Sequence, residues 1–467
     1  MKKVLFILNK YVGLESTEFF YSKFLISLQK ELYNHNIKVS FVLFSKNLEN
    51  IELENKYIFE ADNKVVKDKE VEAHANRIEK EYNFTFKQTL FPDLLQTFKG
   101  QNGTKIVPDE NLFNELNPLI FKFLYLEKLI ITNNYDIIFS DTSPEYEMEF
   151  GRIIGNKLNK IVLKEFLGNA LGNSTIFKLN EFGNFKWIEA QGDNKIEYDE
   201  TKQFIINYKK FQKEPYKKYF ASAPKTNLIN KLLNKNKRDY VIFPFIFINK
   251  FYNRLLLIID KFFKKIFIYK KFDKSKNFLF YGFHLITEST VTYKSMPYTN
   301  QKNLIELISR VLPYNYYLYV REHPHWPKLY KYNFLKTIKN FPNVKIISPD
   351  VSIHDIISNS KGILSLSSTT GIEALMYGKP VLSFASNIYT GYHSSAIYCQ
   401  NLYELGKKIV ELININVDEE ETVKYINRLK NNSVSVGLGS YNFYSKKDSQ
   451  KKANVYAEYF RNIINSL

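Results

Sequence analysis

Two stretches of the sequence carry polar side chains of the kinds that bind phosphate. The first is Arg321-Glu-His323-Pro, in which a guanidinium and an imidazole stand two residues apart. The second is a run of four hydroxyl residues followed by a glycine: Ser367, Ser368, Thr369, Thr370 and Gly371. Hydroxyl and backbone N–H groups at the start of a helix favour a bound anion, glycine permits close approach of the backbone, and arginine adds charge-assisted hydrogen bonds. Both stretches therefore predict contacts with phosphate.

Each stretch follows an apolar run that is typical of a buried parallel strand, at 316–321 and at 361–367. Two more predicted strands end near Phe283 and Ala385, and their ends carry further polar residues: His284, Glu288, Ser386, Asn387, Tyr389 and His393. Ligands of open α/β sheets bind beyond the carboxyl ends of the strands. The sequence therefore predicts a phosphate or pyrophosphate pocket at one sheet edge. Glu373 is the candidate for binding ribose hydroxyls.

Every member of this set also has a simpler interpretation. A His-Pro pair is often only a turn, and a Ser/Thr run before a helix is often only an N-cap. Glu373 could complement the helix dipole, Glu288 could be a capping or surface acid, and Tyr389 could be a core aromatic. These residues all occur at the ends of successive predicted strands, which favours one ligand site over a separate structural role for each residue.

The elements that must position these residues alternate along the chain. In the first part we expect strands at 2–8, 38–44, 135–140 and 160–166, with helices at 17–34, 111–133 and 145–158. In the second part we expect strands at 277–283, 316–321, 344–348, 361–367 and 381–385, separated by helices. This pattern predicts an α/β protein with two Rossmann-like, doubly wound domains that face a cleft. The expected divisions are an acceptor domain at 1–215, a linker at 216–276, a donor domain at 277–440, and a C-terminal helix within 441–467 that packs back on the first domain.

Composition narrows the class of protein. The chain has 467 residues, 45% of them hydrophobic, which suits two packed cores. Cys399 is the single cysteine, so no disulfide forms within the chain. No apolar run is long enough to span a membrane, and the first residues are typical of a strand rather than a signal peptide. We therefore expect a cytoplasmic protein, with peripheral attachment to the inner face of the membrane as an option.

Residues 225–276 differ in charge from the rest of a chain whose net charge is +18. They hold 14 Lys and Arg residues against three acids, Asp239, Asp260 and Asp273, and the basic residues alternate with large apolar ones. A helix lying on an anionic membrane surface needs both kinds of side chain. The alternative is a linker helix that packs on the sheet and leaves a basic face in solvent. No nucleic-acid-binding motif occurs, so nucleic acid is not an expected partner.

Several other chemistries lack their motifs. The histidines do not show metal-ligand spacing, and no Asp-x-Asp pair follows a strand, so we expect no metal. The sequence has no G-x-S-x-G elbow of a serine hydrolase and no G-x-G-x-x-G dinucleotide fingerprint. The expectation is an enzyme without a resident cofactor, whose nucleotide arrives as part of a sugar donor.

Three motifs carry a family resemblance. Arg-Glu-His-Pro at 321–324, Ser-Ser-Thr-Thr-Gly-Ile-Glu-Ala-Leu at 367–375 and Gly-Lys-Pro-Val-Leu at 378–382 resemble those of capsule polysaccharide biosynthesis proteins. That family includes bacterial Kdo transferases, and its motifs are similar to those of bacterial sialyl- and polysialyltransferases. Phe-His-Leu-Ile-Thr-Glu at 283–288 is similar to the family's His-x-x-Pro-Glu segment, with Thr287 in the place of proline. The resemblance extends over about residues 278–400.

The resemblance implies a metal-independent GT-B glycosyltransferase whose donor binds in the C-terminal domain. It implies that His323 and the hydroxyl run from Ser367 to Thr369 hold the phosphate of a CMP-sugar. It also implies that Glu373 holds the ribose and that Glu288 is the acidic residue near the donor. The predicted activity is transfer of an acidic sugar, such as Kdo or sialic acid, from a CMP donor to a surface glycan or glycolipid.

The catalytic base and the donor remain open at this point. The acceptor hydroxyl requires a general base from the first domain, for which Asp141, Glu145 and Glu165 are candidates. Asp141 is preferred because it ends a predicted strand, although an aspartate before a helix can also be a cap. Alternatives on the same frame are a UDP-sugar transferase or 2-epimerase and a CDP-glycerol-type phosphotransferase. A non-catalytic glycan-binding protein is the alternative from another class.

Overall fold

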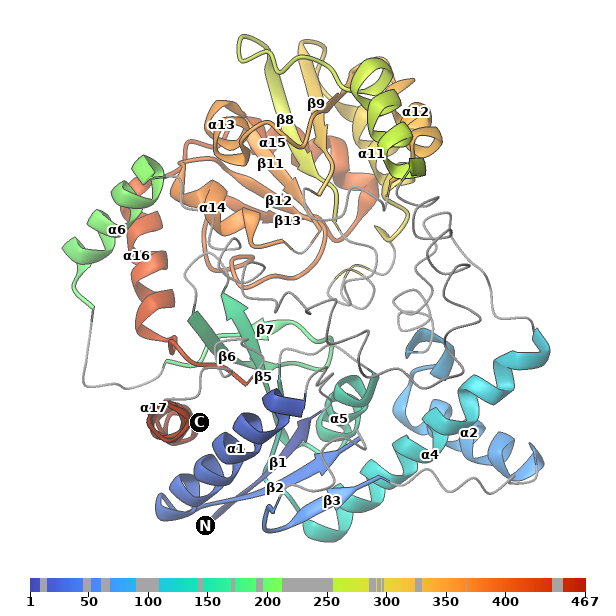
Figure 1. Ribbon diagram of the computed structural model, residues 1–467, viewed down its shortest axis with the longest axis vertical. Helices are drawn as coiled ribbons and strands as arrows, with labels where there is room; N and C mark the ends of the chain where they lie inside the picture. The colour runs from blue at the N-terminus through green and yellow to red at the C-terminus, as the bar shows by residue number, and fades with distance from the viewer. Residues whose placement is uncertain are drawn as a thin grey trace.

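Two β-sheets with flanking helices form the framework of the protein (Figure 1). The structure is a computed structural model. It describes residues 1–8, 15–44, 52–59, 68–89, 109–141, 146–168, 173–189, 196–211, 255–284, 291, 295, 298–323, 330–366, 368–438 and 448–467.

The first sheet has seven strands in the order β3-β2-β1-β4-β5-β6-β7. Their bounds are β1 Lys2–Leu8, β2 Ile37–Leu43, β3 Lys56–Ile58, β4 Ile137–Ser140, β5 Ile161–Gly168, β6 Asn173–Leu179 and β7 Phe185–Lys186. All pairs from β3 to β5 are parallel, whereas β6 and β7 add an antiparallel extension. Residues Val4–Leu8 of β1 are fully buried, as expected for a parallel strand that is covered on both faces.

The helices of the first half are α1 Glu15–Asn34, α2 Asp68–Tyr82, α4 Asp109–Asn133, α5 Tyr146–Lys157 and α6 Tyr198–Phe211. On α1, apolar residues recur at helical spacing, with Phe24, Leu28 and Leu32 all buried against the sheet. On α5, Gly151 and Gly155 allow close packing, because a Cβ at either position would come within 3.0 Å of side-chain atoms of the neighbouring strands.

The second sheet has six strands, all parallel, in the order β10-β9-β8-β11-β12-β13. Their bounds are β8 Asn277–Gly282, β9 Tyr316–Arg321, β10 Val344–Ile347, β11 Gly362–Ser365, β12 Val381–Ser383 and β13 Ala396–Tyr398. The helices are α11 Gln301–Val311, α12 Tyr332–Lys339, α13 Ile353–Asn359, α14 Thr370–Met376, α15 Leu405–Ile413 and α16 Glu419–Asn431, with short helices η3 Lys264–Ile268 and η5 Leu402–Glu404. The predicted pair of doubly wound α/β sheets is confirmed.

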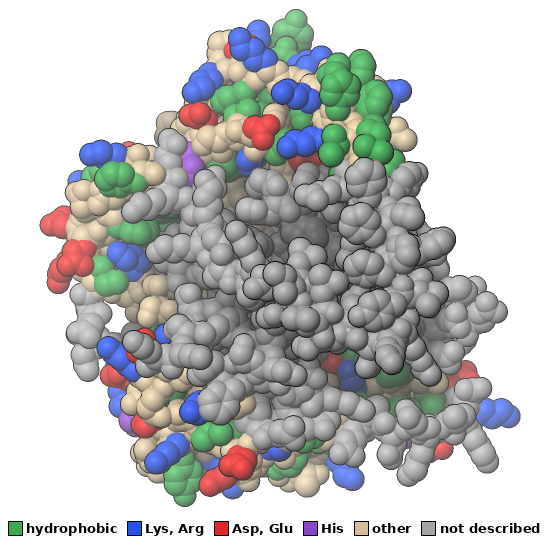
Figure 2. Space-filling view, in the orientation of Figure 1, with side chains coloured by type: hydrophobic (Ala, Val, Ile, Leu, Met, Phe, Trp, Pro, Cys, Tyr) green, Lys and Arg blue, Asp and Glu red, His purple; other side chains and the backbone are tan. Residues whose placement is uncertain are grey.

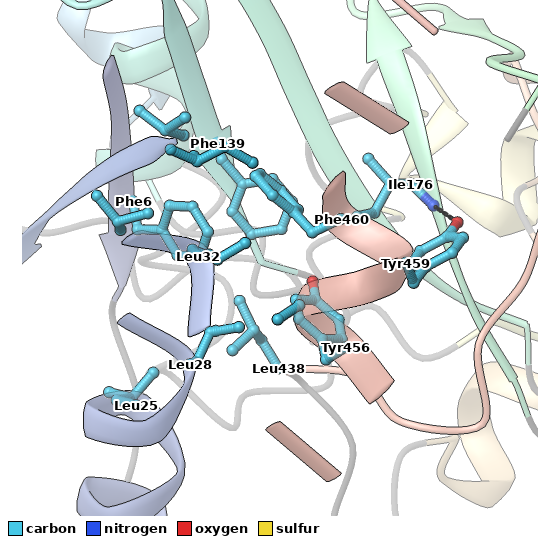
Figure 3. Packing of buried hydrophobic residues seen from close by; sticks show 14 of the residues in the cluster. Phe6, Leu25, Leu28, Leu32, Phe139, Ile176, Leu438, Tyr456, Tyr459 and Phe460 are labelled. Atoms are coloured by element: carbon cyan, nitrogen blue, oxygen red, sulfur yellow. Dashed lines mark hydrogen bonds between the residues drawn. The ribbon is translucent and has the colours of Figure 1, made fainter. Parts of the chain in front are cut away.

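The last part of the chain returns to the first sheet. Val434 forms an antiparallel bridge with Ser174 of β6, and the Leu438 N–H donates to the buried Glu165 carboxylate over 2.9 Å. Helix α17 Ser449–Asn465 then packs beside α1 (Figures 1 and 3). Its Phe460 ring lies 5.2 Å from the ring of Phe6 on β1, so the chain's two ends share one core.

Aromatic contacts join the two halves. The Trp187 indole N–H donates to the Ile388 carbonyl over 3.3 Å, and the Tyr392 hydroxyl donates to the Phe185 carbonyl over 2.9 Å. The Arg428 guanidinium lies over the Trp187 ring at 4.7 Å, an arrangement that favours a cation–π interaction. The loop after β12 is therefore attached directly to the end of the first sheet.

Some features differ from the sequence prediction or lie outside its reach. The antiparallel β6–β7 extension and helices α6 and α16 were not predicted, because the short strand β7 and the polar sequence around it carry little periodic signal. Of the basic segment at 225–276, residues 225–254 lie outside the described residues. The domain boundaries stay predictions.

Among the described helices, none combines the length and the apolar character needed to cross a bilayer.

Tyr459 provides a test of the way α17 is attached. Its hydroxyl accepts a hydrogen bond from the Ile176 N–H at 3.0 Å and donates to the Asn432 carbonyl at 2.8 Å (Figure 3). Tyr459→Phe leaves both buried backbone groups without this partner, so we expect the free energy of unfolding in urea to fall by about 1–3 kcal/mol. The control is Tyr403→Phe, since Tyr403 is 99% exposed. Equal stability of the two variants would contradict this role.

Candidate functional site

Four neighbouring strands of the second sheet end at one edge. In the order β9-β8-β11-β12, each strand pairs with the next, so the polar residues after these strands share that edge. Arg321 is the last residue of β9 and lies opposite Gly282 of β8, and Ser365 of β11 lies opposite Ser383 of β12. The order of the strands along the chain does not reveal which strands are neighbours in the sheet. β9 follows β8 in the chain and pairs with one side of it, whereas the strand on the other side of β8 is β11, which comes later in the chain.

The backbone of His284, just after β8, is held by one buried amide. The Gln301 side-chain oxygen accepts hydrogen bonds from the His284 N–H at 2.9 Å and from the Tyr281 hydroxyl at 2.8 Å. The Gln301 amide nitrogen donates to the His284 carbonyl at 2.8 Å and to the Tyr330 hydroxyl at 3.0 Å. Because all four bonds are made by a side chain that is 2% exposed, the position of His284 is strongly specified.

The His284 ring faces the start of the Ser/Thr turn. Its Nε2 atom accepts the Leu366 N–H at 3.3 Å and lies 3.4 Å from the Ser365 hydroxyl. Burial, and secondly the nearby His323, lowers the pKa of His284 to about 3. The ring is therefore neutral at physiological pH, and its unprotonated Nε2 is free to accept the backbone proton. This position makes His284 a support of the turn from inside the protein.

The described hydroxyls of the turn bind one another and the backbone. The Ser365 hydroxyl accepts the Ser368 N–H at 3.0 Å, and the Ser368 hydroxyl accepts the Thr370 N–H at 3.1 Å. The hydroxyls of Ser368 and Thr370 are 2.8 Å apart. Ser368 and Thr370 are partly exposed, whereas Thr369 is 8% exposed. The turn is thus held by its own hydrogen bonds, and Ser368 and Thr370 are its partly exposed residues.

Tyr389 occupies the space on one side of Gly371. A Cβ at Gly371 would lie 2.4–2.6 Å from three atoms of the Tyr389 side chain, so the glycine has a packing role, and its expected approach to a ligand stays a prediction. That side chain is fully buried, and its hydroxyl donates to the Ser368 carbonyl at 3.1 Å. The Tyr389 side chain therefore packs closely against Gly371 and fixes the turn from behind.

The three side chains of the Arg-Glu-His motif have different surroundings. Arg321 is 8% exposed, and one of its terminal nitrogens donates to the Pro349 carbonyl at 2.8 Å. Glu322 points inward, where it accepts a hydrogen bond from the Lys264 ammonium at 3.1 Å and another from the Tyr269 hydroxyl. Burial raises the pKa of Glu322 above its usual range, and Lys264 opposes that shift. His323 is partly exposed and lies close enough to His284 to affect its pKa.

Other predicted residues of this edge have identified surroundings. Glu373, in the first turn of α14, is 5% exposed and lies near enough to Tyr377 to raise the pKa of that phenol, for which burial is the larger cause. The Asn387 amide donates to the Tyr389 hydroxyl at 3.2 Å. His393 turns toward α16, where its Nε2 is 3.1 Å from the Thr422 hydroxyl, so it supports the loop rather than the Ser/Thr turn.

The first sheet supplies the acidic candidates for a catalytic base. Asp141 follows β4 near the centre of the sheet and is 1% exposed. Lys164 of β5 lies nearby, and burial lowers its pKa while Glu149 and Asp141 oppose that effect. Glu165 is committed to the Leu438 N–H, so it has a structural partner at the chain crossing. Asp141 is therefore the better placed of the two described candidates.

Several predicted residues lie outside the described residues: Glu145, Thr287, Glu288, Pro324 and Ser367. Within the described ranges, no group of three or more His, Cys, Asp or Glu side chains is arranged to hold a metal ion. The predicted roles of all these residues stay predictions.

Sequence reasoning missed two supporting residues of the site. Gln301 begins α11, where an exposed polar residue is the ordinary expectation, and nothing in its neighbours signals a buried amide. Lys264 belongs to a basic stretch that suggests a solvated face, yet it is 2% exposed and bonded to Glu322. Both roles depend on partners far along the chain, so no local pattern could have identified them.

The site lies within a segment that has recognisable relatives. Residues 258–393 match the capsule polysaccharide biosynthesis protein family. The resemblance carried by the Arg-Glu-His-Pro and Ser/Thr motifs is thus confirmed for this segment, which is well under half of the chain. It begins in the helix that precedes Lys264 and ends within the loop that carries Tyr389. No curated protein matches the chain.

Several solved structures are similar over large parts of the chain. The KpsC β-Kdo 2,7-transferase of Thermosulfurimonas dismutans is 16% identical, with 67% of this chain and 86% of that chain covered and a TM-score of 0.33. The UDP-GlcNAc 2-epimerase of Methanocaldococcus jannaschii, solved with UDP-GlcNAc and UDP, is 14% identical, with 92% and 99% covered and a TM-score of 0.29. Anabaena Alr3699/HepE, solved with UDP and glucose, is 12% identical, with both chains fully covered and a TM-score of 0.25. At these scores the superpositions carry no argument about activity.

The packing at Gly371 generates a prediction. Gly371→Ala places a methyl group against the buried Tyr389 ring, so we expect a loss of about 1–3 kcal/mol in the free energy of unfolding. Adding Tyr389→Leu makes room, and the double variant should lose less than the sum of the two single losses, measured by urea unfolding. Gly406→Ala is the matched control, because its nearest neighbour would be 3.6 Å away. Strict additivity of Gly371→Ala and Tyr389→Leu would contradict the contact.

The pKa of His284 generates a second prediction. The unfolded chain binds a proton at this residue near pH 6.5, whereas the folded protein does so only near pH 3, so acidification between these values favours unfolding. We expect the melting temperature to fall as pH drops below about 6.5, and to fall less steeply in His284→Gln, which keeps an acceptor near the position of Nε2. His35→Gln, in the turn after α1, is the control. Parallel pH profiles for wild type and His284→Gln would contradict the buried neutral ring.

Proposed function

We propose that the protein is a glycosyltransferase of capsule or surface polysaccharide biosynthesis. It transfers a sugar, of which an acidic sugar such as Kdo or sialic acid from a CMP donor is our choice, to a glycan or glycolipid acceptor. The observation that carries this proposal is the placement of Arg321 and His323 at the end of β9 and of the Ser/Thr turn at the end of β11, the two strands that flank β8, inside the segment that matches the family.

The proposed donor site works by preorganised electrostatics. As the glycosidic bond to phosphate breaks, negative charge increases on the leaving phosphate, and fixed donors stabilise it without rearranging. The bond from Arg321 to the Pro349 carbonyl fixes one side of the guanidinium. The neutral His284 holds the turn through Leu366, so that Ser368 and Thr370 present their hydroxyls at a set position. His323 and Ser367 complete the phosphate contacts, and Glu373 binds the ribose.

The proposal requires neither a metal nor a resident cofactor. An arginine, a histidine and several hydroxyl and N–H donors can together neutralise a phosphate monoester or diester, and each charge-assisted bond contributes about 1.5–3 kcal/mol. Metal-independent transfer is thus our expectation, and the nucleotide enters as part of the donor substrate.

We assign the general base to Asp141 of the first sheet. It follows a central strand, and it lies close enough to Lys164 of β5 for the two side chains to interact electrostatically. In this role the carboxylate takes the proton of the acceptor hydroxyl as that oxygen attacks the anomeric carbon of the sugar. Glu288 is proposed as the acidic group near the donor.

We also propose that the basic segment at 225–276 contacts an anionic membrane surface. Its 14 basic residues against three acidic ones favour lipid phosphates, and its large apolar residues favour the headgroup boundary. A protein held at a membrane would meet a lipid-linked acceptor there.

A panel of nucleotides tests the donor. We expect CMP, at concentrations above its dissociation constant, to raise the melting temperature of the protein more than CDP or UDP does. The reason is that a ligand that binds only the folded protein stabilises it by mass action. His323→Ala should weaken CMP binding by roughly ten- to a hundredfold, as expected for the loss of one charge-assisted bond, and should abolish transfer. Asp141→Asn should keep CMP binding but lose turnover.

The control variant is His35→Ala, which lies far along the chain from the proposed site. Selective stabilisation by UDP would redirect the proposal to a UDP-sugar transferase or 2-epimerase, and selective stabilisation by CDP to a CDP-glycerol-type phosphotransferase. If no nucleotide raises the melting temperature, the donor-site proposal fails, and a non-catalytic glycan-binding role becomes the better explanation of the protein.

A further inference from the structure

The segment 255–268 turns many large apolar side chains to solvent, whereas its inward side holds a charged pair together with the buried Ile268. Residues 255–263 are α-helical and continue directly into η3. A surface helix normally turns an apolar stripe to the core and charged residues to solvent. Here the inward residues include Asp260 and Lys264, and Lys264 is 2% exposed.

The outward face of this segment consists of large apolar side chains. Their exposed fractions range from 42% to 63%, and they are Leu255, Leu256, Ile258, Ile259, Phe262, Phe263, Ile266 and Phe267. We call this set the outward face. Ile258, Phe262 and Ile266 follow one another at a spacing of four residues and form its most exposed row. In Figure 1 the segment is the yellow-green helix at the upper right, and Figure 2 shows hydrophobic side chains gathered there.

Buried polar bonds hold the segment in this orientation. The Asp260 carboxylate accepts the Tyr332 N–H at the start of α12 at 2.8 Å and pairs with Lys264 at 3.0 Å. Lys264 bonds to Glu322, and the Lys270 N–H donates to the Ile346 carbonyl of β10 at 2.8 Å. Rotation of the helix to bury its apolar face would break this set of charged bonds, which is costly for buried groups. These bonds therefore oppose a rotation that would bury the outward face against the sheet.

The charges around the outward face identify what covers it. Lys261 and Lys265 belong to the same segment and are exposed. Lys270, Lys271, Lys274 and Lys276, which follow along the chain, are exposed as well, and Lys274 pairs with Asp355 at 3.5 Å. Of the two acids in this stretch, Asp260 is turned inward to Lys264, and Asp273 accepts hydrogen bonds from Ser275. A wide apolar face together with these lysines fits the boundary between anionic headgroups and acyl chains, where both kinds of side chain are stabilised at once.

We propose that the outward face docks the protein onto an anionic lipid bilayer. This proposal deepens the membrane contact proposed above, and rests on it, by assigning the contact to one face of one helix. Because Lys264 binds Glu322, between Arg321 and His323, the docked helix is attached to the same sheet edge as the proposed donor site. The bilayer surface therefore lies next to that edge, where a lipid-linked acceptor can be reached.

Vesicle flotation with matched variants tests the proposal. We expect the wild-type protein to float with vesicles of phosphatidylcholine and phosphatidylglycerol at low salt, and much less with phosphatidylcholine alone. Ile258→Ser/Phe262→Ser/Ile266→Ser should weaken vesicle binding by roughly tenfold or more, since each side chain loses its burial in the boundary. The double variant Lys261→Gln/Lys265→Gln should weaken vesicle binding by about fivefold for each lysine that is replaced. The control Leu307→Ser/Val410→Ser, at exposed apolar residues of α11 and α15, should bind as wild type.

A fluorescent label reports the same contact directly. The single native cysteine, Cys399, is 1% exposed, so Phe262→Cys can be labelled with an environment-sensitive dye. We expect a blue shift on addition of anionic vesicles for the label at 262 and none for a label at Tyr403→Cys. All variants should keep their CMP-induced thermal shift, which separates this proposal from the donor-site proposal.

Three results would overturn the proposal. Equal vesicle binding by wild type and the triple serine variant would move the membrane contact to other residues of 225–276. Absence of vesicle binding by the wild type would remove the membrane contact altogether, while leaving the CMP result to decide the donor site. A self-associated wild type in sedimentation, dissociated by the triple variant and indifferent to vesicles, would assign the outward face to a second copy of the chain.

Discussion

The edge of the second sheet depends on a single buried hydrogen-bond arrangement around His284. Gln301 saturates both backbone groups of that residue, and the neutral ring in turn accepts the Leu366 N–H at the start of the Ser/Thr turn. A protonated ring could not accept that bond, so burial, which lowers the pKa of His284, is part of the architecture. The strand order β9-β8-β11 places this support between the two stretches that we propose bind phosphate.

A second constraint comes from the way charged side chains are buried behind the same edge. Glu322 stands between Arg321 and His323 but faces inward, where Lys264 and Tyr269 bind it. Burying such a pair is tolerated only when both partners keep their hydrogen bonds. The consequence is that the segment 255–268, with its outward face toward solvent, is attached to the proposed donor site. The site and the proposed membrane surface thus share one rigid support.

The sequence alone was informative where the signal is periodic or local. Alternating apolar runs predicted the two α/β sheets, and the motifs at 321–324 and 367–375 predicted the family match. It was uninformative where the role of a residue depends on a partner far along the chain. Gln301 bonds to His284 and Lys264 bonds to Glu322, and no local sequence pattern identifies either pair. At Gly371 the structure adds a packing reason for glycine, because the sequence cannot show that the Tyr389 ring fills the space beside it. The antiparallel strands β6 and β7 were missed because β6 begins with three polar residues and β7 has only two residues.

A crystal structure of the protein with CMP would locate the donor site. We expect the CMP phosphate to lie within hydrogen-bond distance of His323 and of the hydroxyl or N–H groups of the Ser/Thr turn, with Arg321 alongside and the ribose near Glu373. We also expect the His284 ring to keep its bond to the Leu366 N–H and not to touch the nucleotide. CMP bound elsewhere, for example at the carboxyl edge of the first sheet near Asp141, would contradict the assignment of the donor site.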